Sequence, residues 1–169
     1  ISKLNESYQT ELKIDKLKFK YGEYPTPIKN LDLLIKMQGH EAAIEYCNLQ
    51  IGSSDIELDG EISDLPAIIH QTNKTIQTKL NIKSNLLDLY ELTGFDSTAI
   101  NEQIKNLQLQ LNFKSSAQTL TVFENLPVGE FYIEDLNAEL QHYPHAFHDF
   151  HANILIDKDI VNWAYKTMW

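Results

Sequence analysis

The chain has 169 residues, 43% of them hydrophobic, so it is long enough for one domain or for one segment of a larger repeating architecture. Its formal net charge of −10 repels phosphate backbones, which argues against nucleic acid as a partner. The single cysteine excludes an internal disulfide, and no apolar run approaches the roughly 20 residues of a membrane-spanning helix.

The N-terminal part of the chain predicts a strand whose apolar phase changes once. Apolar residues occupy even positions up to Ile14 and odd positions from Leu17 onward. A one-residue slip would turn the second set to the wrong face of the sheet. We therefore expect a β-bulge or a tight turn near Asp15 and Lys16.

Three alternating segments follow, at residues 28–37, 43–51 and 55–62. Successive side chains on a strand leave opposite faces, so each segment predicts a strand with one apolar face and one solvated face. The third is the most regular, and its acidic side chains are expected in solvent: Asp55, Glu57, Asp59 and Glu61. The connections are short, which favours an antiparallel meander.

Two short helices are expected between later strands. Ser63 or Asp64 can cap a helix of one or two turns that has Pro66 in its first turn. Asn85 can cap a second helix that runs to Leu92. Each helix would end one repeat of the sheet.

The second half of the chain returns to strand patterns. Residues 75–83 and 104–114 alternate cleanly. The remaining strand candidates are Leu120–Phe123, Phe131–Leu140 and Phe147–Ile156. Residues 157–169 keep the alternation poorly, so a last strand is left open.

An internal repeat is visible in the pattern of the chain. Residues 39–51 align without gaps to 144–156, and residues 21–35 align to 128–140 after a two-residue gap. The interpretation is a first β-repeat at 1–103 and a second, truncated one at 104–169, together forming one continuous structural unit.

No catalytic or cofactor motif accompanies the strands, and neither a cofactor nor a metal is expected. Four histidines recur at every third position: His142, His145, His148 and His151. Imidazole is a common metal ligand, but Pro144 forbids a continuous helix and a spacing of three alternates faces on a strand. A turn followed by a half-solvated strand explains the run better than a metal site. Cys47 lies in an apolar stripe and fits a packed small side chain better than a nucleophile.

Two stretches of the chain resemble a known family. The segment IGSSDIELDGEISDL, followed by a strand and by SNLLDLYEL, resembles the repeat unit of AsmA-like proteins. The segment LPVGEFYIEDLNAELQHYPHAFHDFHANILI is similar to their C-terminal region. The resemblance implies a bridge-type lipid-transfer protein of the AsmA/TamB kind, with a periplasmic β-groove that is apolar inside. It also implies a membrane anchor outside this segment, in the inner membrane.

The sequence therefore predicts a mainly β fold: an antiparallel twisted sheet curled into an elongated groove built from repeats, with two short helices at repeat ends. The expected function is non-enzymatic transport of phospholipids between the inner and outer membranes, in outer-membrane biogenesis. The expected partners are phospholipid acyl chains and envelope proteins. The groove candidates are Leu31, Leu33, Ile35, Leu49, Ile51, Ile56, Leu58, Ile62, Leu107, Leu109, Leu111 and Phe113. The alternative is a structural or protein-interaction β-module of the envelope with a closed core.

Overall fold

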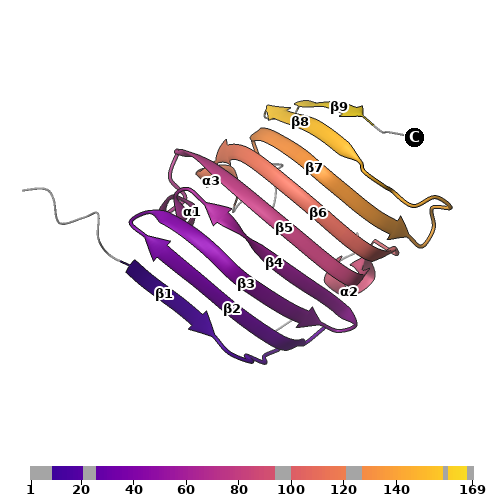
Figure 1. The fold of residues 1–169 in the computed structure, drawn as a ribbon, viewed down its shortest axis with the longest axis horizontal. Helices are drawn as coiled ribbons and strands as arrows, with labels where there is room; N and C mark the ends of the chain where they lie inside the picture. The colour runs from indigo at the N-terminus through magenta and orange to yellow at the C-terminus, as the bar shows by residue number, and fades with distance from the viewer. Residues whose placement is uncertain (1–8, 21–25, 94–99, 121–126, 158–159, 167–169) are drawn as a thin grey trace, which may run out of the picture.

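The computed structural model describes residues 9–20, 26–93, 100–120, 127–157 and 160–166, the last range by its backbone. Its strands form one antiparallel sheet in chain order, so the expected meander is confirmed (Figure 1). The nine strands are β1 (Gln9–Ile14), β2 (Ile28–Gln38), β3 (Glu41–Ile51), β4 (Ser54–Ile62), β5 (Thr75–Asp88), β6 (Gln103–Ser116), β7 (Gly129–Leu140), β8 (His151–Asp157) and β9 (Ile160–Lys166). The first and last strands of this sheet do not pair with each other, so the sheet is open.

In the described part of the chain, three short helices accompany the sheet: α1 (Leu65–Ile69), α2 (Leu89–Thr93) and α3 (Ala117–Leu120). Asp64 is the N-cap of α1, because its Oδ1 accepts a hydrogen bond of 2.9 Å from the backbone N–H of Ala67. Pro66 lies in the first turn, as expected. Among the described residues, none of the helices has the length and apolar character needed to cross a membrane.

The cross-strand register gathers the apolar side chains into rows. One row is formed by successive Cα partners on six strands: Leu33, Cys47, Leu58, Ile82, Leu109 and Leu136. Directly opposed side chains in an antiparallel pair lie on the same face. The alternation in the sequence therefore becomes a continuous apolar face and an opposite hydrophilic face.

The phase change after β1 is repaired by a bulge, as predicted. Lys16 has a φ of +52°, and its N–H donates a hydrogen bond of 2.7 Å to Asp32 Oδ1. Pairing then resumes, since Leu17 and Leu31 exchange backbone hydrogen bonds of 3.1 and 3.0 Å. The extra residue returns Leu17 to the face that Ile14 occupies.

A second bulge in β3 has the same effect. Leu34 of β2 opposes Tyr46, whereas the next residue, Ile35, opposes Ile44, so Glu45 is the additional residue. The Glu45 carboxylate lies 3.2 Å from the Lys36 ammonium group on the hydrophilic side. Because of this bulge, Ile44 and Cys47 share one face although three positions separate them.

The prediction of a helix at Asn85–Leu92 is wrong for the first half of that segment. Strand β5 continues to Asp88, and only α2 is helical. Asp88 is the residue that acts as the cap, because its Oδ1 accepts a hydrogen bond of 3.1 Å from the Glu91 N–H. The Asn85 side chain instead donates to Asp55 on the neighbouring strand, a tertiary contact that local sequence does not reveal.

The C-terminal third also differs from the expectation. Leu120 ends α3, a third helix, instead of beginning a strand, and the rest of that candidate lies outside the described residues. Phe147 forms only an isolated bridge with Ala138, and β8 begins at His151. Strand β9 pairs with β8, so the chain after Ile156 continues the sheet. The predicted repeat boundary at 103/104 falls inside β6, and the division stays a prediction.

The prediction that the Asp55 side chain lies in solvent is wrong, because this side chain is half-buried and hydrogen-bonded. Its two carboxylate oxygens accept hydrogen bonds from the backbone N–H groups of Asn85 and Leu86, at 3.1 and 2.9 Å. Burial alone would raise the pKa of this carboxyl group, but the hydrogen bonds outweigh that effect and lower it. Glu57 and Glu61 are exposed, as expected.

Replacing Asp55 by Ala should lower the free energy of unfolding by about 1–3 kcal/mol at neutral pH, because two strand N–H groups lose their acceptor. Urea denaturation measures this difference. The matched control is Glu57→Ala on the same strand, where the side chain is exposed and the change should stay within about 0.5 kcal/mol.

The effect of Asp55→Ala should also depend on pH. A carboxyl group whose pKa is lowered in the folded state adds stability above its unfolded pKa of about 3.9, and this stability is lost as the pH falls through the folded pKa. The difference between parent and variant should therefore shrink in acid. A difference that grows on acidification would contradict the assignment.

Candidate functional site

All twelve residues predicted to line a groove lie at register positions of the apolar face. Leu31 opposes Leu49, which opposes Ile56, and Ile62 connects through Thr78 to Phe113. Leu33, Leu58 and Leu109 belong to the row given above, while Ile35 and Leu111 belong to the next row. Ile51 pairs with Ile28, and Leu107 pairs with Ser84.

The short helices cover the two ends of this face. At one end Ile76 is fully buried against Ala67 of α1 and Ala117 of α3. At the other end Leu92 of α2 packs against a cluster built on Leu87, Leu107 and Ala138. Figure 1 shows α1 and α3 near one end of the strands and α2 near the other.

Between the two covered ends lies a row of residues that we call the central strip. Its members are successive Cα partners on eight strands: Leu12, Ile35, Ile44, Gly60, Leu80, Leu111, Ile133 and Ala152. None of them belongs to either of the helix-covered clusters. Leu12 is 50% exposed at the edge of the sheet, and the strip is only partly buried along most of its length.

Gly60 interrupts the side chains of the central strip. A Cβ atom at this position would overlap the backbone carbonyl of Lys79 on β5 and would press against the Leu80 side chain. Glycine is therefore required for the close approach of β4 and β5 at this point. The close approach brings Ile44 and Leu80 to either side of a position with no side chain.

The polar atoms on the apolar face are few. Two hydroxyl groups there, Thr78 Oγ1 and Ser84 Oγ, are buried without a hydrogen-bond partner among the described residues. Ser54 and Ser115 are also buried, but their hydroxyl groups bond to backbone atoms. The face therefore presents aliphatic and aromatic surface with hardly any directed donor or acceptor.

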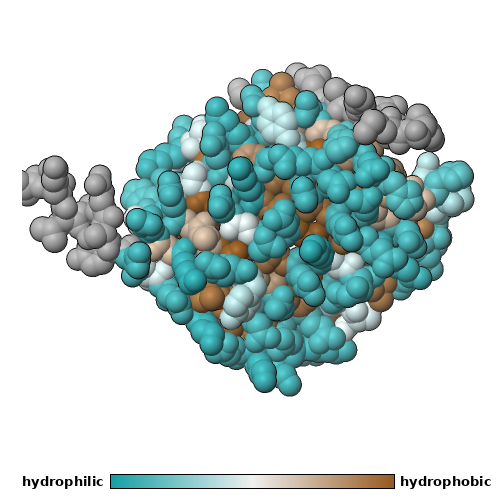
Figure 2. Space-filling model, in the orientation of Figure 1, coloured by the Kyte–Doolittle hydropathy of each residue, from teal (hydrophilic) through white to brown (hydrophobic). Residues whose placement is uncertain are grey.

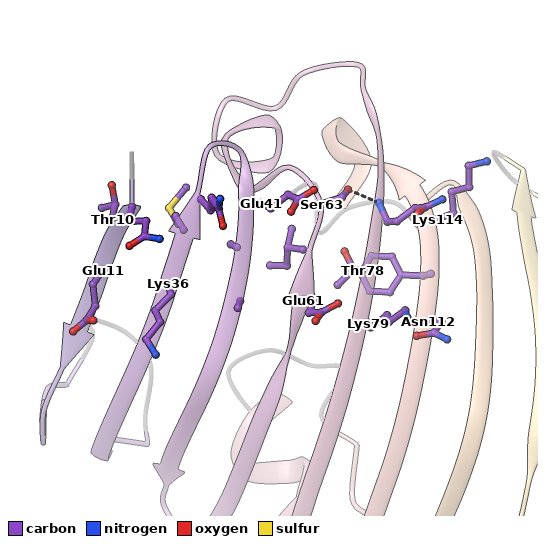
Figure 3. Close-up of a pocket in the computed structure, with 18 of the residues that line it drawn as sticks. Thr10, Glu11, Lys36, Glu41, Glu61, Ser63, Thr78, Lys79, Asn112 and Lys114 are labelled. Atoms are coloured by element: carbon purple, nitrogen blue, oxygen red, sulfur yellow. Dashed lines mark hydrogen bonds between the residues drawn. The ribbon is translucent and has the colours of Figure 1, made fainter. Parts of the chain in front are cut away.

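The opposite face carries a hydrophilic trough of about 1140 Å³. Figure 2 shows hydrophilic side chains over most of this face. Figure 3 shows Glu11, Lys36, Glu61 and Lys79 along the trough, on β1, β2, β4 and β5. Its lining also includes one row of the apolar face, so the hydrophilic face does not form the trough alone: Met37, Ala42, Ile62, Thr78 and Phe113. The trough was not predicted, because alternation marks a polar face without showing its curvature.

Charges of both signs alternate along the hydrophilic trough. Glu11 of β1 opposes Lys36 of β2, and Glu61 of β4 opposes Lys79 of β5. The Tyr132 hydroxyl donates a hydrogen bond of 2.9 Å to Glu130, and this bond to a carboxylate raises the tyrosine pKa. The mixed charge gives the trough no strong field for an anion or a cation.

Cys47 lies on the apolar face and is half-buried. Burial raises the pKa of its thiol, so the reactive thiolate is disfavoured. This environment is that of a packing side chain, and it agrees with the interpretation of Cys47 from the sequence.

Three of the four histidines in the run contact separate partners. His142 Nδ1 lies 3.2 Å from Glu102 Oε2, the His145 ring stands at an angle to Tyr143, and His151 Nδ1 contacts the Glu134 backbone oxygen. Within the described ranges, no three histidine, cysteine or acidic side chains come together in a group that could hold a metal ion.

Comparisons with protein-family models, with curated proteins and with solved structures find no match to this chain.

The histidine run should not bind zinc tightly. Calorimetric titration with Zn²⁺ should give only weak heats, unchanged in His148→Ala, because the rings of His142, His145 and His151 contact different groups. Stoichiometric binding with sub-micromolar affinity that disappears in His148→Ala would overturn this prediction.

The central strip and the helix-covered end should respond differently to a buried charge. Ile76→Asp places a carboxylate under α1 and α3 and should cost about 4 kcal/mol or more. Leu111→Asp should cost roughly half of that or less, because water can reach a partly exposed strip. Urea midpoints measure both, and equal losses would mean that the strip is as closed as the covered end.

Proposed function

We propose that this chain is a segment of an AsmA-like, bridge-type lipid-transfer protein of the bacterial envelope, and that its apolar face carries phospholipid acyl chains. The observation that carries the proposal is the central strip, which crosses eight strands without belonging to a helix-covered cluster. The resemblance of the two sequence segments named above supports the same family.

The dimensions of the strip suit acyl chains. Eight strands about 4.8 Å apart give the strip a length of roughly 34 Å. Half of a bilayer core is about 15 Å thick, which is the distance one acyl chain spans in its leaflet. The strip is therefore long enough for two acyl chains end to end.

The chemistry of the strip favours binding without strong positional preference. Each methylene removed from water contributes about 0.8 kcal/mol, so a few contacts suffice to hold a chain. Neighbouring positions are alike, because Ile35, Ile44, Leu80 and Leu111 are all aliphatic. A chain that slides by one position exchanges similar contacts, which permits movement along the strip with no catalytic step.

In this proposal the full-length protein lies in the periplasm and is anchored in the inner membrane outside the segment described. The headgroups stay in water beside the sheet, and the charge of −10 penalises anionic headgroups slightly. The transport is passive and needs neither a cofactor nor a metal ion.

The second candidate is an envelope β-module whose apolar face is covered by another protein sheet. The observation that favours it is the partial burial of the strip, since a partly exposed aliphatic surface is also what a partner sheet about 10 Å away would cover. The two candidates differ in what lies on the strip in the cell, and that difference can be measured.

A photoreactive amino acid at position 111 should capture phospholipid in bacteria, whereas one at position 110 should not. The two positions are adjacent on β6, but Leu111 faces the central strip and Gln110 is exposed on the hydrophilic face. Mass spectrometry of the crosslinked protein identifies the captured molecule.

Capture of a protein at position 111 and of no lipid would favour the envelope module. Equal lipid labelling at positions 110 and 111 would show that lipid does not distinguish the two faces, and the transfer proposal would fail.

A further inference from the structure

The connection between β7 and β8, residues 141–150, carries an unusual group of side chains, and we call it the aromatic turn. Its rings are Tyr143, Phe147 and Phe150, together with three of the four histidines. Figure 1 shows this connection projecting beyond the sheet, at the end where α2 lies.

The rings of the aromatic turn form a chain of contacts. Tyr143 and Phe147 are stacked, with ring centroids 5.7 Å apart and planes 16° apart. Phe147 meets Phe150 edge to face at 5.9 Å. Tyr143 is 49% exposed, so the aromatic turn presents an aromatic side chain to its surroundings.

The aromatic turn is tied to the sheet by backbone hydrogen bonds. Phe147 and Ala138 exchange two bonds of 3.1 and 2.8 Å, and the Phe150 N–H donates to the Leu136 carbonyl at 3.2 Å. Ala138 and Leu136 both belong to the cluster at the α2 end of the apolar face. Because paired residues share a face, Phe147 extends the apolar face into the turn.

The charge of this segment differs from that of the whole chain. Residues 141–150 contain no lysine or arginine and one acidic residue, Asp149, in a protein with a net charge of −10. Tyrosine and histidine rings combine an apolar body with a polar edge, as side chains at a membrane–water interface do. An anionic bilayer therefore repels this projecting, nearly neutral aromatic group less than it repels the acidic strands.

We propose that the aromatic turn contacts the interface of a phospholipid bilayer and is the point at which acyl chains pass between the membrane and the apolar face. This inference rests on the proposed function, because a membrane contact is useful here only if the apolar face carries lipid. The contact adds a location to that function: transfer begins or ends at the α2 end of the sheet.

A fluorophore sensitive to polarity reports the contact directly. Cys47→Ala removes the native thiol, and Ala146→Cys then places the label on an exposed residue of the aromatic turn. On addition of phosphatidylcholine vesicles the emission of this label should shift to the blue. The matched control is Asn48→Cys in the same background, an exposed residue of β3, whose emission should not change.

Tyr143→Ser tests the contribution of the exposed ring. Partition into phosphatidylcholine vesicles should fall about fivefold or more, because one aromatic side chain loses its apolar contact with the interface. Tyr132→Ser removes an exposed tyrosine from the hydrophilic face and should leave partition unchanged. Equal blue shifts at positions 146 and 48, or unchanged partition in Tyr143→Ser, would overturn the inference.

The failure of this inference can be told apart from failure of the proposed function. With a photoreactive residue at position 111, a dispersed fatty acid tests the apolar face alone, and phosphatidylcholine vesicles test transfer from a membrane. Tyr143→Ser should slow capture from vesicles while capture of the fatty acid is retained. If Tyr143→Ser and its parent capture lipid from vesicles equally, the membrane contact is wrong and the proposed function stands. If the parent captures neither the fatty acid nor the vesicle lipid, the proposed function itself is wrong.

Discussion

The structure depends on keeping one face apolar across every strand pair. A strand has a side-chain period of two, so a single inserted residue would exchange the faces for the rest of the strand. Insertions do occur, at Lys16, at Glu45 and in β7 at Glu134, between the residues that pair with Gln110 and Leu111. The register also shifts between Ile28 and Asn30 of β2 and between Lys105 and Gln108 of β6. Each insertion is absorbed as a bulge, after which the next apolar residue is again on the apolar face. The bulges at Glu45 and Glu134 lie next to Ile44 and Ile133, two members of the central strip.

The fold also requires that β4 and β5 stop pairing near the start of α2. Strands β4 and β5 stop pairing at Glu57 and Lys83, and side chains of β4 then replace the backbone ladder. Asp55 accepts bonds from the next backbone N–H groups of β5, and Ser54 Oγ accepts one of 2.9 Å from Asp88 N–H. From the turn before β4, the N–H and hydroxyl of Ser53 donate to Glu91 of α2. These bonds hold α2 over one end of the apolar face.

Local patterns explain which parts of this fold could be predicted. The strands, the bulge at Lys16 and the cap at Asp64 follow from alternation and from side-chain chemistry within a few residues. The segment from Asn85 to Leu92 suits a helix locally. Its first half is extended because it pairs with β6 and because Asp55 and Ser54, some thirty positions earlier, accept hydrogen bonds from it.

The candidate site likewise has features that the sequence predicts and features that it does not. The twelve apolar residues share a face because alternation determines facing, and this could be predicted. The hydrophilic trough depends on how the seven strands β1 to β7 curve together, and the aromatic turn depends on Phe147 pairing with Ala138. Neither property is present in a local pattern.

The sheet protects its first edge more than its apolar face. An exposed edge strand invites pairing with other chains, and bulges and charged side chains are common protections against it. Strand β1 is short and polar, Lys13 pairs with Asp15 at 3.0 Å, and the Lys16 bulge interrupts the edge. The central strip has no comparable protection, because no charged side chain belongs to it. The proposed acyl chains would lie across the strands along the central strip, a surface that strand addition at the β1 edge would not cover.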